Sequence, residues 1–413
     1  MKIDYLLEKN NVVIKQAVIL AGGLGKRLGE RSLNCPKPMQ LINKKPFLDN
    51  IIWNLKRHDI TDIILSIGYL AKNFKDYYGN GSKLGVKITF VEEQQPEGTG
   101  GALRKCSNLL DEYFLLINGD TISDINYHDL ALNFQRDKIG TLGLSFVKNT
   151  GRYGEVHTDG LEIISFKEKK GHNSGYINSG VSIFNKKILN YIPSGNCSLE
   201  KDIFQKLLKR RLLMAKKYNS FFLDIGTPET LKYAQSAIPK WKSKSALFLD
   251  RDGVINVDYG YVHSMKNFKF INGAKEMIKL ANDSGIIVIV VTNQAGIARG
   301  FYSEEEFKSF TKQINEKLKN YGAHIDATYF CPHHPLYGKG DLRRDCKCRK
   351  PKSGMLEIAI SEWNLNKRNC FLIGDKKSDL LAASNCGIKG YLFSEKKDNL
   401  LEIFKTKIST FKS

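Results

Sequence analysis

Two carboxylates at close spacing are the first feature of this sequence that could do chemistry. Asp250 and Asp252 directly follow the apolar run 246–249. Both side chains can face one site when the chain bends out of a sheet after a strand. Asp250 could then attack a phosphorus atom, while Asp252 protonates the leaving sugar oxygen and later activates water. The pair indicates hydrolysis of a phosphate ester through an aspartyl-phosphate intermediate.

Further polar groups follow later apolar runs of the same half. Thr292 and Asn293 offer a hydroxyl and an amide to phosphoryl oxygens, and Arg349 and Lys350 supply fixed positive charge. Asp375 is expected to bind magnesium, because a carboxylate is a ligand that Mg²⁺ prefers. Each residue alone could be an ordinary polar group at a strand end. The four elements in this order favour one phosphate site.

Cysteine spacing predicts a metal site beside these residues. Cys331, Cys346 and Cys348 cluster with His333, with His334 as an alternative ligand. Three thiolates and one imidazole complete a tetrahedral zinc shell and leave no open position, so the zinc is expected to be structural. The remaining cysteines are scattered singly and do not form a disulfide pattern; they are Cys35, Cys106, Cys197, Cys370 and Cys386.

A glycine-rich turn in the first half predicts a second phosphate site. Gly22, Gly23 and Gly25 follow the apolar run 16–20, and Arg27 and Lys37 come shortly after them. Glycines allow backbone N–H groups to approach a triphosphate, and the two cations can neutralise a leaving pyrophosphate. Such turns also simply join strands to helices, but the added cations favour nucleotide binding.

The elements that position these residues alternate short apolar runs with amphipathic segments in both halves. This pattern is typical of βαβ units around a parallel sheet, and therefore predicts an α/β fold with ligands beyond the carboxyl ends of the strands. Strand-like alternation with many turns over 143–185 predicts a mixed-sheet excursion in the first half. The polar, proline-containing segment 236–245 is expected to be a linker. The predicted organisation is an N-terminal extension 1–14, domains over 15–235 and 246–413, and this linker between them.

The first half resembles the sugar-1-phosphate nucleotidylyltransferases over residues 15–235. The motif G-x-G-x-R followed by Pro36-Lys37-Pro38 carries this resemblance, and later segments continue it in order. The resemblance implies a Rossmann-like fold with a mixed sheet, in which QQPEGTGGA over 94–102 recognises the base. It implies nucleotide contacts from Gln94, Gly98, Thr99 and Gly100, sugar contacts from Gly154, Glu168, Lys169 and Asn178, and Mg²⁺ ligands Asp120 and Asp224.

One position departs from that family's pattern. Lys26 stands where Thr or Ser is usual, which leaves the backbone N–H groups in place but alters the local side chain. The implied reaction is a direct displacement in which a sugar 1-phosphate oxygen attacks the nucleotide α-phosphorus and pyrophosphate leaves. Positioning and electrostatics then supply most of the catalysis.

The second half resembles the haloacid-dehalogenase superfamily over about 245–395. The motifs DRDGVIN, TNQAGIARG, CRKP and GDKKSDLLAA place it near the group that contains histidinol phosphatase and heptose bisphosphate 7-phosphatase. This resemblance implies a Rossmann-like fold with a zinc loop and Mg²⁺ bound by Asp250, Asp252 and Asp375. It favours His333 over His334 as the zinc ligand.

Together the two resemblances imply consecutive steps. The phosphatase would remove the 7-phosphate from a heptose 1,7-bisphosphate, and the first half would join the remaining α-heptose 1-phosphate to GMP from GTP. The alternatives are a mannose 1-phosphate guanylyltransferase or other nucleotide-sugar synthase, fused to a histidinol-phosphate or other sugar phosphatase. A regulatory protein with decayed sites is disfavoured, because every expected catalytic residue is present.

The charge and composition restrict the remaining classes. A net charge of +21 invites a nucleic-acid interpretation, but the excess is mostly lysine spread along the chain, without a basic arm. Phosphate-bearing substrates also favour a positive surface. No apolar run is long enough to cross a bilayer, and the N-terminus lacks a secretion signal. We therefore expect small-molecule partners only, without nucleic acid or membrane, in the cytoplasm; the sequence does not define an oligomeric state.

Overall fold

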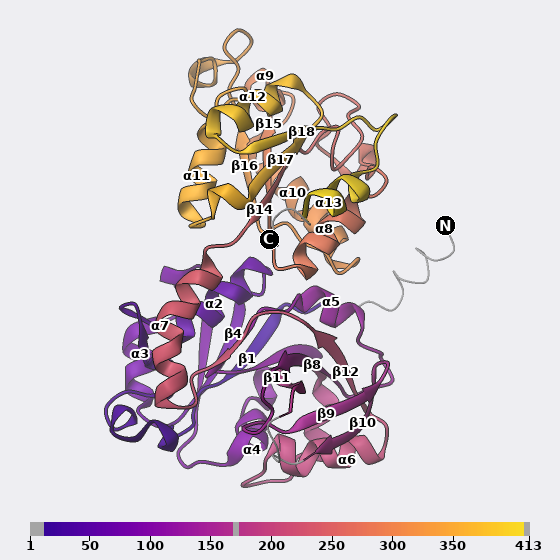
Figure 1. Ribbon diagram of the computed structural model, residues 1–413. Helices are drawn as coiled ribbons and strands as arrows, with labels where there is room; N and C mark the ends of the chain where they lie inside the picture. Colours follow the sequence, from indigo (N-terminus) through magenta and orange to yellow (C-terminus); the bar gives the residue numbers. More distant parts are fainter. Residues whose placement is uncertain (1–11, 168–172, 409–413) are drawn as a thin grey trace. The chain divides into compact units, whose positions relative to one another are not determined.

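The computed structural model describes residues 12–167 and 173–408 of the chain (Figure 1). The chain forms two compact units, Met1–Pro239 and Lys240–Ser413. Each unit has an α/β architecture of its own, which agrees with the predicted fold class. In the described residues, no helix combines the length and apolar character needed to cross a membrane.

The N-terminal unit is built on one large mixed sheet. Among the described residues the strand order is β5 (Lys87–Glu92), β4 (Asp62–Ile67), β1 (Gln16–Leu20), β6 (Tyr113–Asn118), β11 (Gly175–Asn185), β8 (Gly140–Val147), β12 (Leu213–Tyr218), β10 (Glu162–Lys167) and β9 (Glu155–Asp159). The four strands from β5 to β6 are parallel, whereas β11 is antiparallel to both β6 and β8. The mixed sheet expected over 143–185 is confirmed.

Helices cover both faces of this sheet. They are α2 (Leu48–Arg57), α3 (Ala71–Tyr78), α4 (Gly98–Lys105), α5 (Tyr127–Leu132), α6 (Phe204–Lys209) and α7 (Pro228–Lys242). Figure 1 shows α4 and α6 together on one side, where Leu103 and Phe204 join a core with Val18 and Leu116. Two small antiparallel pairs, β2 (Leu41–Ile42) with β3 (Lys45–Pro46) and β7 (Thr121–Ser123) with β13 (Phe222–Asp224), complete the unit.

The C-terminal unit has an all-parallel sheet. Among the described residues the order is β16 (Ala327–Cys331), β15 (Ile287–Asn293), β14 (Ala246–Leu249), β17 (Cys370–Gly374) and β18 (Lys389–Leu392). Its helices are α8 (Ala274–Asp283), α9 (Ala295–Arg299), α10 (Glu304–Lys319), α11 (Gly354–Glu362), α12 (Lys377–Cys386) and α13 (Leu400–Ile408). The order places β14 and β15 side by side, so the residues after these strands share one edge.

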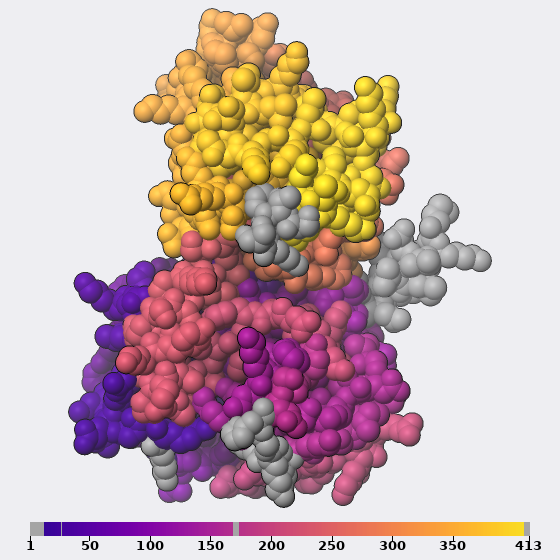
Figure 2. Space-filling view, viewed as in Figure 1, coloured from indigo at the N-terminus to yellow at the C-terminus, as the bar shows by residue number. Residues whose placement is uncertain are grey.

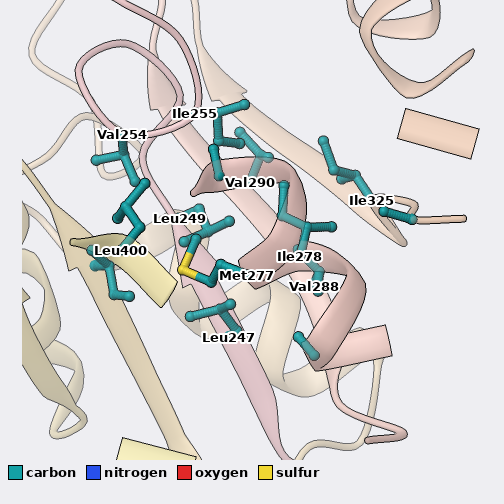
Figure 3. Packing of buried hydrophobic residues seen from close by; sticks show 14 of the residues in the cluster. Leu247, Leu249, Val254, Ile255, Met277, Ile278, Val288, Val290, Ile325 and Leu400 are labelled. Carbon is teal, nitrogen blue, oxygen red and sulfur yellow. The ribbon is translucent and has the colours of Figure 1, made fainter. Parts of the chain in front are cut away.

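Both faces of this sheet are buried, because successive side chains of a strand point to opposite sides. Leu247 and Leu249 enter one core with Met277 and Ile278 of α8 (Figure 3). Phe248 enters the core on the other face. Continuous apolar strands are typical of parallel sheets covered on both sides. This core is what fixes the strand ends that carry the polar residues.

The expected linker over 236–245 contains the boundary between the two compact units, after Pro239. It is more regular than its composition indicates, because residues 236–242 continue helix α7 in spite of Pro239. Ala237, Ile238 and Trp241 are buried, so this segment presents an apolar stripe at helical spacing that its polar composition masks.

Candidate active sites

The glycine-rich turn follows β1 at the carboxyl edge of the N-terminal sheet. Gly25 has φ +64°, and a Cβ there would lie 3.3 Å from the Cβ of Lys37. Glycine is therefore required both by the backbone conformation and by the close approach of the next segment. The turn leads into a 3-10 helix, Lys26–Ser32, and a second one, Lys37–Met39, holds the PKP element.

A cavity of about 390 Å³ opens at this turn. The sequence-predicted residues Gly22, Gly23, Gly25, Arg27, Lys37, Gly98, Thr99 and Asp120 line it, together with Leu20, Ala21, Pro38, Glu93, Pro96, Ala102, Asn118 and Gly226. The glycine turn, the cations and the 94–102 segment thus meet in one place. Its mix of backbone, carboxylate and cationic groups suits a nucleoside triphosphate.

The two expected metal ligands, Asp120 and Asp224, lie on paired chain segments. Asp224 is opposite Thr121 in the β13–β7 pair, and the amide of Ile225 donates to the carbonyl oxygen of Asp120 at 3.0 Å. The Lys37 ammonium contacts the Asp120 carboxylate. The two acids are therefore neighbours, but only Asp120 lines the cavity, and Asp224 lies outside its lining.

Basic and hydroxyl groups surround the Asp224 carboxylate. Arg152 lies 2.9 Å from Asp224 Oδ1, and the Tyr153 hydroxyl donates to Oδ2. A Cβ on Gly226 would lie 2.6 Å from Asp224 Oδ1 and 3.5 Å from Lys37 Nζ. Gly226 therefore keeps open the space that Asp224 shares with Lys37.

Other predicted contacts lie elsewhere. Gln94 is exposed and does not line the cavity, and Gly100 packs against Cys197. Gly154 and Asn178 also lie outside its lining, while Glu168 and Lys169 fall outside the described residues.

Glu93 is a lining residue that the sequence did not single out. Burial raises the pKa of its carboxyl group, with a partly offsetting hydrogen bond from the Glu97 amide at 3.3 Å. A Cβ on Gly22 would lie 2.5 Å from Glu93 Oε1. Its position directly after β5, at the same sheet edge as the glycine turn, could have identified it from the sequence.

The second cavity, of about 230 Å³, lies at the carboxyl edge of the C-terminal sheet. Asp250, Asp252, Thr292, Asn293 and Lys350 line it as a group, together with Asp258, Gly260, Tyr261, Gln294, Ala295, Tyr302, Lys376, Ser378 and Asp379. These residues come from the end of β15, from the segments that follow β14, β15 and β17, from the loop before α11 and, for Tyr302, from the turn between α9 and α10. Arg349 is not among the lining residues; it donates to the His333 carbonyl oxygen at 3.1 Å.

Lys350 joins two buried acids. Its Nζ lies 3.0 Å from Asp250 Oδ1 and 2.6 Å from Asp379 Oδ1, and donates to the Val291 carbonyl oxygen at 2.8 Å. Burial alone lowers the pKa of Lys350, but the two carboxylates more than offset this, and the pKa lies above its usual value. The lysine is therefore charged and fixed.

Asp250, Asp375 and Asp379 form an acidic group whose ligand oxygens lie within 4.8 Å of one another. Burial raises the pKa of Asp375 to about 6, and its Oδ1 is buried without a hydrogen-bond partner among the described residues. A Cβ on Gly253 would lie 2.3 Å from Asp375 Oδ2. An Asp375 oxygen without a partner, beside the carboxylates of two further acids, is suited to bind a divalent cation.

The Asp252 carboxylate points to a different set of partners. It accepts hydrogen bonds from Arg251, from Asn256 Nδ2 at 3.0 Å and from Gln294 Nε2 at 3.2 Å. Buried Gln294 also accepts from the Tyr302 hydroxyl at 2.6 Å. These hydrogen bonds orient the Asp252 carboxylate, which is not part of the acidic group of Asp250, Asp375 and Asp379. Sequence analysis did not single out Gln294 or Arg251.

The predicted zinc ligands form a compact cluster. The Sγ atoms of Cys331, Cys346 and Cys348 lie 3.2 to 3.4 Å apart, and His333 Nδ1 lies 3.3 Å from Cys348 Sγ. His334 Nδ1 instead accepts from the amides of Leu336 and Tyr337. The donor set fits tetrahedral zinc, and its loop, in orange, stands out from the unit in Figure 2.

Comparison with known proteins agrees with this division. The nucleotidyl transferase family model matches residues 16–240, and a HAD-hydrolase-like model matches 347–402. The second half is 45% identical over 147 residues to D-glycero-β-D-manno-heptose-1,7-bisphosphate 7-phosphatase of Haemophilus ducreyi, covering 35% of this chain and 80% of that protein.

The first half also resembles a protein that is named for a heptose phosphate. It is 38% identical over 228 residues to D-glycero-α-D-manno-heptose 1-phosphate guanylyltransferase of Aneurinibacillus thermoaerophilus, covering 54% of this chain and 98% of that protein. The crystal structure of HddC from Yersinia pseudotuberculosis, which is also known in complex with GMP-PN, is 33% identical at a TM-score of 0.50 and covers 55% of this chain and all of that one. The chain is thus an enzyme that belongs to the nucleotidyl transferase family through its first half and to the heptose bisphosphate 7-phosphatase family through its second.

Proposed function

We propose that this enzyme makes GDP-heptose in two steps. The unit over 246–413 removes the 7-phosphate from D-glycero-α-D-manno-heptose 1,7-bisphosphate, and the unit over 15–235 transfers GMP from GTP to the resulting heptose 1-phosphate. The observation that carries the proposal is the presence, in one chain, of a phosphate-ester cavity and a nucleotide cavity whose relatives act on successive heptose phosphates.

Phosphate removal begins at Asp250. The Arg251 amide donates to its Oδ1 at 2.8 Å and Lys350 Nζ lies 3.0 Å from the same atom, which leaves Oδ2 to attack the phosphorus of the 7-phosphate. As the phosphorus–oxygen bond breaks, Asp252 gives its proton to the sugar oxygen. Water then attacks the phosphoaspartate, Asp252 takes a proton from that water, and phosphate leaves with Asp250 restored. Such proton transfers contribute about 10²- to 10⁴-fold to rate.

Fixed charge supports these steps. Thr292, Asn293 and Lys350 line the cavity and are placed to bind the phosphoryl oxygens. Mg²⁺, when bound by Asp250 and Asp375, would neutralise charge on the phosphoryl group. Gln294 and Asn256 hold the Asp252 carboxylate for proton transfer. We assign the cysteine cluster to a structural zinc that pins the loop carrying Arg349 and Lys350.

Nucleotide transfer uses no covalent protein intermediate. An oxygen of the sugar 1-phosphate attacks the GTP α-phosphorus while the bond to pyrophosphate breaks. The glycine turn binds the triphosphate through its backbone, and Arg27 and Lys37 neutralise the leaving pyrophosphate. Mg²⁺, when bound by Asp120 and Asp224, would draw the phosphate oxygens of both substrates together. Lys37 and Arg152, which contact these acids, are placed to bind phosphate as well.

The anomer links the two steps. The name of the phosphatase relative specifies the β anomer, whereas that of the guanylyltransferase relative specifies the α anomer. Phosphate removal at C7 leaves the configuration at C1 unchanged, so both units must accept the same anomer for the intermediate to pass between them. We propose the α anomer, which the guanylyltransferase relative has in its name. The use of GTP and the presence of free thiols are consistent with the proposed cytoplasmic location.

The test supplies the purified enzyme with either anomer of heptose 1,7-bisphosphate, GTP and Mg²⁺, and follows phosphate, pyrophosphate and nucleotide-sugar mass. The α anomer is expected to yield all three products. Asp250→Asn should abolish phosphate release, and Asp120→Asn should abolish pyrophosphate release while phosphate release continues. Phosphate without any nucleotide sugar, for both anomers and for a panel of nucleoside triphosphates, would contradict the proposed second step.

A further inference from the structure

A turn outside the first cavity holds one wall of that cavity. Gly98 and Thr99 line the cavity at the start of α4. They pack against the turn 197–200, which lies between β11 and α6 in the chain and which we call the clamp. In the part of the chain that the structure describes, no residue of the clamp lines the cavity. Its contacts can therefore act on a bound nucleotide only through the residues that it holds.

The clamp and the segment 97–100 are joined through their backbones. The Gly100 amide donates to the Cys197 carbonyl oxygen, and the Cys197 amide donates to the Glu97 carbonyl oxygen, each at 2.8 Å. The contact is close, because a Cβ on Gly98 would lie 2.6 Å from the Cys197 carbonyl oxygen and one on Gly100 would lie 3.0 Å from Cys197 Sγ. A side chain at either glycine would push the segment away from the clamp.

The Thr99 hydroxyl adds a side-chain link to the same turn. The Leu199 amide donates to Thr99 Oγ1 at 2.8 Å, and Thr99 Oγ1 donates to Glu200 Oε2 at 3.1 Å. A hydroxyl has one proton to donate, and here the clamp accepts it. Although Thr99 lines the cavity, its hydroxyl therefore has no proton left for a nucleotide.

The clamp is itself fixed. Leu199–Ile203 form a π-helix, a rare conformation that occurs frequently at functional sites. Ser198 caps it, since its Oγ accepts from the Lys201 amide at 3.2 Å and its amide donates to Asp202 Oδ2 at 2.7 Å. Helix α6 continues directly from the π-helix, and its first residue, Phe204, is buried in the core of the N-terminal unit. The clamp therefore ties the cavity wall to this core.

We propose that the clamp positions the nucleotide-binding residues at the start of α4, and that Thr99 is a positioning residue. The resemblance to the nucleotidylyltransferases implies a direct nucleotide contact at Thr99, whereas its hydrogen bonds assign its hydroxyl an indirect role. Without this hydroxyl, the segment 97–100 keeps its backbone contacts but is held less firmly, so GTP binds more weakly. The transfer step of bound GTP depends on Arg27 and Lys37, and continues. This inference rests on the proposed function for the identity of the nucleotide, and not for the clamp.

The test measures GTP binding and pyrophosphate release by the full-length enzyme with Mg²⁺. Binding is followed with a fluorescent GTP analogue and needs no sugar substrate. Thr99→Val keeps the shape of the side chain and removes both hydrogen bonds, so the Kd and KM for GTP should rise about five- to tenfold. At saturating GTP, kcat should stay within about twofold of the wild-type value, which also reports that the unit is folded. Thr99→Ser keeps the hydroxyl and should recover the wild-type Kd.

A second pair of variants separates the clamp from a direct contact by Thr99. Gly100 and Cys197 both lie outside the cavity lining. Gly100→Ala places a methyl group against Cys197 Sγ and should raise the Kd for GTP. Cys197→Ala removes that sulfur, so the double variant should bind GTP more tightly than Gly100→Ala alone. Ser194→Ala, at an exposed position shortly before the clamp, should leave both Kd and kcat unchanged.

The outcomes separate this inference from the proposed function. An unchanged Kd for Thr99→Val, a fall in kcat alone, or independent effects of Gly100→Ala and Cys197→Ala would overturn the clamp. If another nucleoside triphosphate binds in place of GTP and Thr99→Val weakens its binding, the clamp stands and the proposed nucleotide is wrong. If GTP reacts as proposed and the Thr99→Val and Gly100→Ala enzymes bind it like the wild type, the converse is true.

Discussion

The phosphatase cavity contains one buried lysine, Lys350, that holds two acidic residues together. Lys350 is enclosed by Asp250, Asp379 and a backbone carbonyl group. Removal of one member of such a buried pair typically costs about 3–5 kcal/mol, because the partner charge remains without compensation. Lys350, which we propose binds phosphate, should therefore also stabilise the fold, and its substitution should lower stability together with activity.

Asp375 gives this cavity a pH dependence. Burial raises its pKa to about 6, and a proton on this carboxyl group competes with Mg²⁺. The apparent Mg²⁺ affinity should be constant from pH 7 to 8 and fall below pH 6, by up to about tenfold per pH unit. Phosphate release measured against Mg²⁺ concentration at each pH checks this.

The control for that measurement is Asp375→Asn, which should bind Mg²⁺ weakly at every pH. An affinity that stays constant from pH 7 to 5 would exclude Asp375 as a ligand.

Sequence reasoning reached the residues at strand ends but missed those that depend on packing. Asp250 and Thr292 follow apolar runs, and the strand order places both at one cavity. Gln294 became visible only in three dimensions, because its partners Asp252 and Tyr302 are set by loops. Gln94 and Arg349 were included from motifs, yet neither lines the two cavities described above. A motif places a residue along the chain and does not fix its side-chain direction.

Helix α10 positions Arg251, which binds the Asp252 carboxylate in the phosphatase site. The rings of Phe307 and Phe310 in this helix pack against the Arg251 guanidinium, whose Cζ lies 5.5 and 5.3 Å from the two ring centroids. The helix begins with a capping box, in which Ser303 and Glu306 bond each other's backbone amides. The position of Arg251, and so of Asp252, depends on this helix.

Loss of the cap should weaken the unit without changing its chemistry. Ser303→Ala leaves one amide of the first turn without its side-chain acceptor, so the free energy of unfolding should fall by about 1 kcal/mol. Denaturation followed by circular dichroism measures the change.

Ser309→Ala, an exposed site within the same helix, should have no such cost. Equal effects of the two substitutions would show that the cap does not stabilise the helix.

Element types were largely predictable, and the exception has a physical cause. The apolar runs correspond to strands, because a buried parallel strand requires continuous apolar sequence. The helix over 236–242 was not predicted, because the segment contains proline and several lysines, while the helix depends on buried Ala237, Ile238 and Trp241. Burial against distant residues cannot be read from local composition.

At the scale of the whole molecule, each unit has its own sheet, core and cavity. The α/β class was predictable from the alternation of elements, and the order of the strands was not, because pairing depends on contacts far apart in the sequence. Among the described residues, the cluster of Cys331, His333, Cys346 and Cys348, which we propose binds zinc, belongs to the second unit. Its loss should therefore affect only one of the two reactions.

A zinc-selective chelator in excess Mg²⁺ should separate the activities. Loss of the cluster frees the loop that carries Arg349 and Lys350, so phosphate release should fall by at least tenfold, while pyrophosphate release from GTP and heptose 1-phosphate continues. Both products can be followed in one sample.

Added zinc should restore phosphate release. A parallel fall in both activities would show that the cluster also supports the nucleotidyl transferase unit.

The same cluster has a consequence for redox chemistry. Its three sulfur atoms lie 3.2 to 3.4 Å apart, so a small movement brings any two to the bond length of a disulfide, about 2.05 Å. Because three is an odd number, air oxidation of the metal-free protein would join two sulfurs and leave one reactive thiol. That thiol can attack the new bond or cross-link a second molecule. Bound zinc would therefore protect the three thiolates, and its removal would make the loop sensitive to oxidation.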